Sequence, residues 1–316
     1  MIGIGDIREA RGRIHDKVHR TPLVRSTMLS RRTGGTAYLK LENMQKTGSF
    51  KPRGALNNIL ALSPQRRDKG LITISAGNHA QGVAYAAAQV GAHAIVVMPA
   101  GASASKAEAT RGYGAEVVLH GDVEAAFEKV EELRKEKDLT FIHPFDDDAT
   151  IAGQGTVGQE IVEDLPGVAT VVAGIGGGGL ISGVALAVKS LAPRARVVGV
   201  EPTGAAAMHL SRRNGSPVRL EAIDTIADGL APPFVGERNF EVVQACVDEL
   251  VLVDDDEIRA AMRFLLERCK VLAEPAGAAA TAAVLSGKIP ETAGDTVVIV
   301  SGGNISMESL AGCLRG

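Results

Sequence analysis

A lysine occupies a confined position in KTGSFKPRGA, residues 46–55, where its amine could act as a nucleophile or a base. Proline fits the first turn of a helix and disfavours helical backbone in the residue before it, so we expect a helix from Pro52 with Lys51 extended at its N-terminus. The positive helix end, Lys46 and Arg53 all disfavour a further cation, which predicts a lowered pKa for Lys51 and a neutral amine suited to Schiff-base chemistry. Taken alone, the pattern also fits an ordinary surface lysine.

Four consecutive glycines, Gly176 to Gly179, follow an apolar run in TVVAGIGGGGLISG and precede a helical pattern. A strand that runs through glycines into a helix points backbone N–H groups and the helix dipole at a ligand, an arrangement that binds phosphate. The loop also matches GxGxxG at Gly174, Gly176 and Gly179, and Glu201 follows at about the distance where dinucleotide sites place a ribose-binding acid. A nicotinamide-dependent dehydrogenase and a nucleotide-binding module without catalysis are therefore alternatives.

A second strand-to-helix junction occurs in ITISAGNHAQG, where successive N–H groups could hold a carboxylate. The residues at this junction are Ser75, Ala76, Gly77, Asn78 and His79. Asn78 could donate to a ring oxygen or simply cap the helix, and His79 is not assigned to catalysis. A phosphate site, a special lysine and the lack of a metal-binding motif suggest a phosphate-bearing aldehyde, and pyridoxal 5'-phosphate (PLP) fits that description.

Short β-branched runs alternate with stretches of helical period, which predicts an α/β fold with parallel sheets. The second half of the chain opens its own series of strands at Thr170, so we expect two α/β domains with a boundary near residue 145 and a ligand in the cleft between them. Strands are predicted at 37–42, 71–75, 94–99, 116–121, 140–144, 170–175, 196–201, 249–254 and 296–303. Helices are predicted at 52–62, 78–91, 103–114, 122–138, 148–165, 178–191 and 255–269.

The composition of the 316-residue chain points to small-molecule partners. A formal charge of −3 provides no basic field for nucleic acid or anionic lipid, and 3% aromatic residues leave no stacking platforms for single strands. The three cysteines, Cys246, Cys269 and Cys313, lack CxxC spacing, as expected of buried free thiols in a reducing cytoplasm. Because no apolar run is suited to a bilayer or a signal peptide, we expect a cytoplasmic protein.

The ordered motifs of the chain resemble those of the fold-type II PLP enzymes, the family that includes threonine and serine dehydratases and serine racemase. These motifs are KTGSFKPRGA, SAGNHAQG, HPFDD, IAGQGT, GGGGL, GVEP, TIADGLA, AEPAGAAA and SGGN. The resemblance implies a tryptophan-synthase-β-like fold, with a large PLP-binding domain at residues 1–51 and 146–316 and a small domain at 52–145. It is strongest to short threonine dehydratases, because the chain stops soon after SGGN and we expect no C-terminal regulatory domain.

The resemblance also implies roles for individual residues. Lys51 corresponds to the lysine that holds PLP covalently, and Phe50 to a neighbour of the cofactor ring. Asn78 corresponds to the partner of the pyridine hydroxyl, and Ser301 to the hydroxyl that meets the pyridine nitrogen. The phosphate-binding loop of the family corresponds to Gly176, Gly177, Gly178 and Gly179. The substrate-binding residues correspond to Ser75, Ala76, Gly77, Asn78, His79 and Gly229.

Two departures from the racemases within this family refine the expected activity. Racemases have a serine, an acid and base on the second face of the substrate, where this chain has Ala76, so alanine favours elimination over racemisation. The cation site of the racemases corresponds to Glu201 and Ala205, but Ala207 stands where a further carboxylate is expected. A bound divalent cation is therefore doubtful, because hard cations need several oxygen ligands.

The predicted function is PLP-dependent β-elimination from a 3-hydroxy amino acid. We expect conversion of L-threonine to 2-oxobutanoate and ammonia, with L-serine to pyruvate as a secondary activity, because one methyl group contributes only about 1 to 3 kcal/mol to discrimination. Serine racemisation and dehydration of 3-hydroxyaspartate are alternatives within the family. A homodimer or homotetramer is the family's expected assembly.

Overall fold

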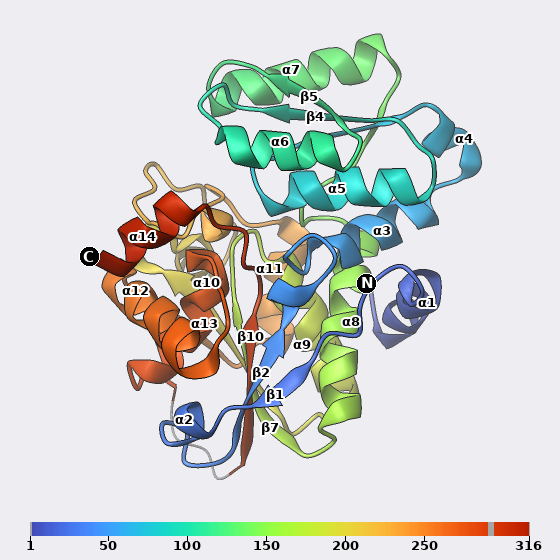
Figure 1. The fold of residues 1–316 in the computed structure, drawn as a ribbon. Helices are drawn as coiled ribbons and strands as arrows, with labels where there is room; N and C mark the ends of the chain where they lie inside the picture. Colours follow the sequence, from blue (N-terminus) through green and yellow to red (C-terminus); the bar gives the residue numbers. More distant parts are fainter. Residues whose placement is uncertain (1, 290–293, 316) are drawn as a thin grey trace.

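The computed structural model describes residues 2–289 and 294–315, which form two lobes, each built around one sheet (Figure 1). The smaller lobe holds a four-stranded sheet in the order β5-β4-β3-β6, and all of its strand pairs are parallel. These strands are β3 (Leu71–Ile74), β4 (Ala94–Met98), β5 (Glu116–Leu119) and β6 (Thr140–Phe141). Every residue of β3 and β4 is buried, as expected of central parallel strands covered on both faces.

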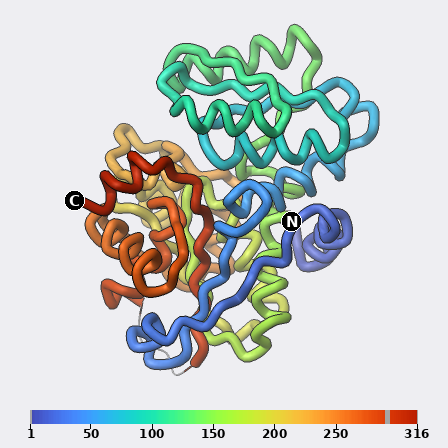
Figure 2. The backbone as a smooth tube through the Cα atoms, viewed as in Figure 1, coloured from blue at the N-terminus to red at the C-terminus, as the bar shows by residue number. Residues whose placement is uncertain are grey.

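The larger lobe holds a six-stranded sheet in the order β1-β2-β10-β7-β8-β9. Its strands are β1 (Leu23–Arg25), β2 (Ala37–Leu41), β7 (Val168–Gly174), β8 (Arg196–Pro202), β9 (Glu249–Val253) and β10 (Asp295–Val300). The pairs are parallel except for β1 with β2, which is antiparallel at the edge of the sheet. Figure 2 shows the smaller lobe as one continuous stretch of the chain, coloured cyan to green, between two stretches that build the larger lobe.

Helices cover both sheets. The smaller lobe carries α4 (Pro64–Asp68), α5 (Asn78–Gln89), α6 (Ala104–Gly112) and α7 (Val123–Glu136). The larger lobe and the junction carry α1 (Ile4–Ile14), α2 (Thr27–Ser30), α3 (Lys51–Ala61), α8 (Asp148–Asp164), α9 (Gly179–Leu191), α10 (Ala207–Asn214), α11 (Glu237–Cys246), α12 (Asp255–Phe264), α13 (Pro275–Leu285) and α14 (Met307–Arg315). Short 3-10 turns occur at η1 (Glu42–Met44), η2 (Thr203–Ala205) and η3 (Asp228–Leu230), and η4 (Leu265–Cys269) is a π-helix.

The predicted strands are confirmed, with shorter ends in several cases, and three differences from prediction have physical explanations. The antiparallel strand β1 was not predicted, because three residues give too little period-2 pattern. Helix α3 begins at Lys51, so the prediction of an extended Lys51 was wrong; Pro52 is tolerated in the first turn because N–H groups there have no intrahelical acceptor. The helix predicted at 255–269 widens into the π-helix η4 over its last turn.

A fully buried ion-pair network joins α3 to the larger lobe. The Arg53 guanidinium, which is 0% exposed, donates to both carboxylate oxygens of Glu42 at 2.8 Å and to Glu160 on α8 at 2.7 and 3.0 Å. Lys40 on β2 donates to Glu160 at 2.6 Å. Two cations and two anions thus neutralise each other, and the start of α3 is held against η1 and α8.

Among residues 2–289 and 294–315, no helix has both the length and the apolarity that a membrane crossing requires. The same residues contain no group of three His, Cys, Asp or Glu side chains arranged to hold a metal ion. All three cysteines are free and partly buried, so the expectation of free thiols is confirmed although their burial is incomplete.

Candidate active site

A cavity of about 380 Å³ lies between the two lobes and is lined by residues of both. The predicted site residues among them come from five separate segments, which are the start of α3, the β3–α5 junction, the β7–α9 loop, η3 and the end of β10. The predicted site residues that line it are Phe50, Lys51, Ser75, Ala76, Gly77, Asn78, His79, Gly176, Gly177, Gly178, Gly179, Gly229 and Ser301. The carboxyl ends of parallel strands from both sheets thus meet at one site, as expected for open α/β folds.

Lys51 places its amine within this cavity. Its Nζ donates to the Pro144 carbonyl at 3.1 Å and lies 5.1 Å from the centre of the Phe50 ring. Burial lowers the pKa of Lys51 to about 8, while the negative charge of Glu274 acts in the opposite direction. The amine is therefore substantially neutral at slightly alkaline pH, which is the form that attacks an aldehyde or accepts a proton.

The predicted direction of this pKa change is confirmed, but the predicted cause is wrong. Arg53 cannot contribute much repulsion, because Glu42 and Glu160 neutralise its guanidinium. Lys46 is not a cause of the shift either. Removal of the amine from water accounts for the lowered pKa of Lys51.

The glycine loop packs tightly against an aromatic ring. Strand β7 ends at Gly174 and α9 begins at Gly179, so the loop leads directly into the N-terminus of the helix. Gly178 has φ +99°, a left-handed conformation that favours glycine, and a Cβ on Gly177 would lie 2.4 Å from the Phe145 ring. The loop can therefore pack its backbone against the Phe145 ring only because Gly177 has no side chain.

Asn239 on α11 supports the outer side of this loop. Its Nδ2 donates to the carbonyl oxygens of Gly177 and Phe145, both at 3.0 Å, and the Gly236 N–H donates to the Gly177 oxygen at 3.1 Å. These bonds occupy a loop carbonyl and direct it away from the cavity side of the loop. The arrangement leaves N–H groups at the first turn of α9 for an anion.

Asn78 is the first residue of α5 and belongs to a hydrogen-bonded chain at the cavity wall. Its Nδ2 donates to Glu274 Oε1 at 2.5 Å, and its Oδ1 accepts from Asn304 Nδ2 at 2.8 Å. The N-cap of α5 is Gly77, so the alternative that Asn78 caps the helix was wrong. Because an amide nitrogen carries two hydrogens, Asn78 keeps one donor for a ligand oxygen.

The β3–α5 junction partly matches the expected carboxylate site. The Gly77 N–H donates to the Ser75 hydroxyl at 3.1 Å, so this donor already has an intramolecular partner. The His79 ring is held inside the smaller lobe, because Nε2 lies 3.0 Å from Thr73 Oγ1 and 3.3 Å from the Ile142 carbonyl. Burial keeps the pKa of His79 well below its usual value, so the ring is neutral and structural.

Ser301 and Gly229 complete the predicted set. The buried Ser301 hydroxyl lies 3.4 Å from the Ala276 carbonyl, a long contact that leaves it able to turn toward a ligand atom. A Cβ on Gly229 would lie 2.8 Å from the Ala276 side chain. Both residues thus border the cavity beside the start of α13.

Glu201 lies outside this cavity and has another function. Its two carboxylate oxygens accept the N–H groups of Met208 and His209, each at 2.7 Å, at the start of α10. Burial raises the pKa of Glu201 to about 8, and the two backbone bonds act against this rise. A side chain that is 1% exposed and caps a helix is not placed to bind a ribose, so the dehydrogenase alternative loses its acidic residue. Ala205 lies in the adjoining turn η2.

Several residues of the site had no role assigned from the sequence. Glu274 and Asn304 stand in the motifs AEPAGAAA and SGGN, and Phe145 in HPFDD, so the motifs themselves could have indicated them. Burial raises the pKa of Glu274 to about 7, whereas its hydrogen bond from Asn78 acts in the opposite direction. Asn239 and Lys106 lie outside those motifs, and only the three-dimensional structure brings them to the site.

Comparison with known proteins agrees with this geometry. The family model described as pyridoxal-phosphate dependent enzyme matches residues 14–303. The chain is 48% identical over 311 residues to L-threonine ammonia-lyase from Thermotoga maritima, covering 98% of this chain and 77% of that relative. The structure of maize serine racemase superposes with TM-score 0.95 at 39% identity, covering 99% of this chain and 97% of that one. The structure of the processed form of threonine deaminase isoform 2 from Solanum lycopersicum superposes with TM-score 0.93 at 40% identity, covering 99% of this chain and 91% of that one.

The structure combines two lobes built on mainly parallel sheets with a lysine of lowered pKa in the cavity between them. The chain belongs to the family of pyridoxal-phosphate dependent enzymes. The predicted PLP fold type II is confirmed. The residues present also fit the cofactor chemically, because the cavity combines an amine of lowered pKa, a glycine cradle at a helix N-terminus and the Ser301 hydroxyl.

Proposed function

We propose that this enzyme removes water and ammonia from a 3-hydroxy amino acid, converting L-threonine to 2-oxobutanoate and ammonia. L-Serine would give pyruvate and ammonia in the same way. The observation that carries the proposal is the lowered pKa of the Lys51 amine in one cavity with two helix N-termini. Relatives named L-threonine ammonia-lyase and threonine deaminase support it.

In this proposal the cofactor is held by four elements. The N–H groups of Gly176 to Gly179 would bind its phosphate, and Lys51 would form the covalent attachment. The Ser301 hydroxyl would face the ring nitrogen, and Asn78 would donate to the ring hydroxyl. Phe50 borders the ring. PLP, when bound, withdraws electrons from the α-carbon of the attached amino acid.

Lys51 would also act as the base at the α-carbon. Once the substrate amine replaces it, its neutral amine can accept the α-proton, because a pKa near 8 keeps a large neutral fraction. Ser75, Ala76, Gly77 and the first N–H groups of α5 would hold the substrate carboxylate, with Gly229 on the other side. Ala76 offers no proton to the opposite face, which favours elimination over racemisation.

The cavity walls favour a substrate with an apolar β-substituent. The side chains of Ile74, Phe141 and Phe234 line the cavity, and apolar contact with the methyl group of threonine is worth about 1 to 3 kcal/mol. L-Threonine is therefore preferred over L-serine in this proposal. Serine racemase remains the alternative within the family, because a racemase structure superposes closely on the chain.

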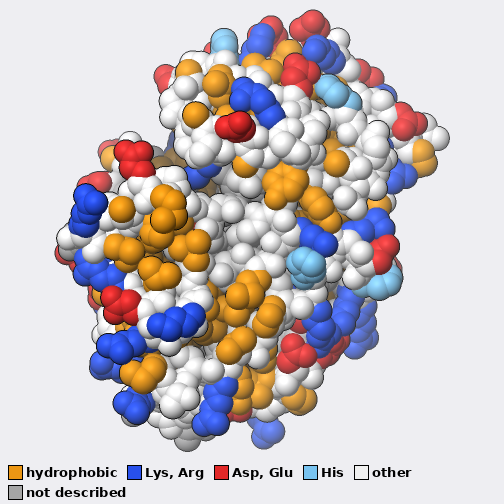
Figure 3. Space-filling view, viewed as in Figure 1, with side chains coloured by type: hydrophobic (Ala, Val, Ile, Leu, Met, Phe, Trp, Pro, Cys, Tyr) orange, Lys and Arg blue, Asp and Glu red, His pale blue; other side chains and the backbone are white. Residues whose placement is uncertain are grey.

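We also propose a homodimer or homotetramer. Large hydrophobic side chains are exposed on the larger lobe, and Figure 3 shows hydrophobic side chains gathered on its visible face. The exposed residues include Val24, Met28, Met44, Leu272 and Met307.

Three further expectations stay predictions. They are a cytoplasmic location, the domain boundaries at 51/52 and 145/146, and the doubtful cation at Glu201 and Ala205.

The proposed activity is tested with purified holoenzyme and a panel of L-threonine, L-serine and the 3-hydroxyaspartates, with 2-oxo acid detection. We expect the highest kcat/KM for L-threonine, and a panel without 2-oxo acid from either L-threonine or L-serine would refute the proposal. Borohydride reduction followed by peptide mass spectrometry should place the cofactor on Lys51. The Lys51→Ala variant should lose at least about 10³-fold in kcat, because both attachment and proton transfer depend on the amine.

The choice between elimination and racemisation needs a separate measurement. Serine recovered from a partial reaction is analysed for the configuration of its α-carbon. We expect L-serine with little D-serine from the wild-type protein, and appreciable D-serine would show that Ala76 does not determine the outcome. The Ala76→Ser variant is the matched comparison, and it should raise the D-serine yield.

A further inference from the structure

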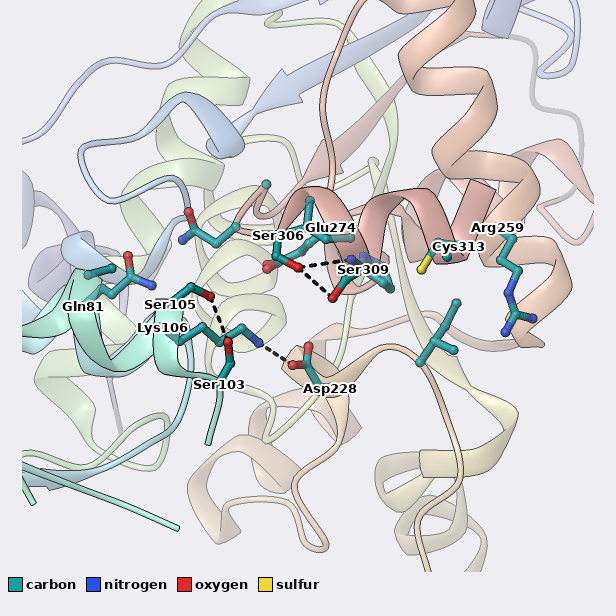
Figure 4. A pocket seen from close by; sticks show the side chains of 17 residues that line it. Gln81, Ser103, Ser105, Lys106, Asp228, Arg259, Glu274, Ser306, Ser309 and Cys313 are labelled. Atoms are coloured by element: carbon teal, nitrogen blue, oxygen red, sulfur yellow. Dashed lines mark hydrogen bonds and ion pairs between the residues drawn. The ribbon is translucent and has the colours of Figure 1, made fainter. Parts of the chain in front are cut away.

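A salt bridge spans the two lobes at the edge of the active-site cavity. Lys106 on α6 of the smaller lobe donates to Asp228 in η3 of the larger lobe at 2.5 Å. Both residues line the active-site cavity and also a second, neighbouring cavity of about 690 Å³. Figure 4 shows the two side chains reaching toward each other, and because both residues line both cavities, the salt bridge lies where the cavities adjoin.

The pair determines how much positive charge a substrate meets. The lysine and arginine side chains that line the active-site cavity are Lys51, which is assigned to the cofactor, and Lys106. The charge of Lys106 is matched directly by Asp228. A second carboxylate entering the cavity would therefore lose water without gaining an unpaired cation, which is unfavourable.

The electrostatic influence of the pair extends to the site itself. Asp228 raises the pKa of Glu274 and Lys106 lowers it, in addition to the larger effects of burial and of the bond from Asn78. The negative charge of Glu274 in turn raises the pKa of Lys51. The two charges of the pair thus act in opposite directions on Glu274, and removal of one would leave the other unopposed there.

We propose that Asp228 is a specificity-determining residue, which masks Lys106 and so excludes substrates that carry a second carboxylate. The inference rests on the proposed dehydration of 3-hydroxy amino acids and adds the substrate class that is rejected. The side chain of Lys106 is 25% exposed and that of Asp228 is 63% exposed, so the lysine is the more buried partner of the pair.

The test is a double-mutant cycle with Asp228→Asn, Lys106→Met and the double variant. For each holoenzyme, kcat/KM is measured for L-threo-3-hydroxyaspartate and for L-threonine, and the ratio of the two is compared. Asparagine keeps the shape of Asp228 but removes its charge, so the ratio should rise about fivefold to tenfold in Asp228→Asn. It should return to near the wild-type value in the double variant, because the unmasked cation is gone.

The cycle separates specificity from a merely structural contact between the lobes. If the salt bridge only holds the lobes together, Asp228→Asn lowers both kcat/KM values equally and the ratio does not change, which would overturn the proposal. A rise that persists in the double variant would overturn it too, because Lys106 would not be the cause. Lys129→Met removes a lysine of the same lobe that pairs with Glu132 on the surface, and it should leave the ratio unchanged.

A binding measurement keeps this inference distinct from the proposed activity. Calorimetric titration of the four holoenzymes with L-aspartate and L-alanine gives an affinity ratio that needs no dehydration. We expect Asp228→Asn to raise the aspartate-to-alanine ratio about fivefold or more, and an unchanged ratio would refute the masking of Lys106. If the wild-type protein does not turn over threonine, the proposed function is refuted, but the ratio of the aspartate and alanine affinities still tests the masking of Lys106.

Discussion

At the scale of single residues, the site depends on the removal of Lys51 from water. The helix that begins at Lys51 offers a positive end, yet burial is the main cause of the lowered pKa, and Glu274 opposes it. The amine also keeps a hydrogen bond to the Pro144 carbonyl at 3.1 Å, so its position is defined in either protonation state. This environment suits the two roles proposed for Lys51, which are attachment of the cofactor and proton transfer.

The pKa of Lys51 can be measured by trace acetylation of the apoprotein at different pH values. Only the neutral amine reacts, so Lys51 labelling should rise with pH around a midpoint near 8, whereas N-acetyl-lysine amide in the same tube should titrate near 10.4. Peptide mass spectrometry reports the labelled fraction. A midpoint near that of the free amine would mean that burial does not act on Lys51 as the structure indicates.

The glycine cradle gives a second prediction at this scale. Gly177→Ala places a Cβ 2.4 Å from the Phe145 ring, so either the ring or the loop must shift, at a cost of about 1 to 3 kcal/mol. We expect PLP affinity to fall about tenfold to hundredfold, measured by equilibrium titration of apoprotein. Gly167→Ala is the control, because a Cβ there meets no atom within 4 Å and affinity should be unchanged.

At the scale of elements, the buried network of Arg53 fixes the helix that carries Lys51. Burial opposes ionisation of Glu160, but the ion pairs with Arg53 and Lys40 outweigh it and hold the pKa of this carboxyl below its usual value. Neutralising one carboxylate of the network leaves a buried cation without its partner. This costs far more free energy of unfolding than the loss of a surface pair.

We therefore expect Glu160→Gln to lower the free energy of unfolding by about 3 to 5 kcal/mol. Glu163 is the matched control on the same helix, because its pairs with Arg11 and Arg20 lie at the surface, and Glu163→Gln should cost about 1 kcal/mol or less. Urea unfolding of both variants measures the difference. Equal effects at the two positions would contradict an energetic role for burial of the network.

The elements also show what the sequence could and could not predict. Strands such as β4 and β7 were predictable, because their β-branched runs are bounded by turns, and the glycine loop followed from the strand before it. The bond of Asn78 to Glu274, 196 residues apart, and that of Lys106 to Asp228, 122 apart, depend on how the lobes meet. No local pattern encodes such contacts, so sequence indicated the motifs but not their partners.

At the scale of the whole molecule, two sheets bring their carboxyl ends to one cleft. The larger lobe supplies the glycine loop and Ser301, and the smaller lobe supplies the β3–α5 junction. Lys51 stands at the junction and is tied to the larger lobe through the network of Arg53. Relative movement of the lobes would therefore change the contact between the proposed substrate and cofactor sites, while Lys51 stays with the glycine loop.

The stability of the whole molecule should depend on pH through Glu201. Its pKa is raised to about 8 in the folded protein from an ordinary value of 4.5. Between these values the folded state binds one more proton than the unfolded state, so the contribution of Glu201 to the free energy of unfolding falls as pH rises, by at most about 1.4 kcal/mol per pH unit.

Glu201→Gln removes this dependence, since glutamine does not titrate. The free energy of unfolding of the wild type minus that of Glu201→Gln should therefore decrease between pH 5 and pH 8, measured by urea unfolding at fixed cofactor and protein concentrations. Glu163→Gln should show no such decrease, because burial raises the pKa of Glu163 less than its arginine and glutamine contacts lower it, and that contribution is lost only in acid. A wild-type minus Glu201→Gln difference that stays constant from pH 5 to pH 8 would show that the two N–H bonds from α10 keep the buried carboxylate ionised throughout.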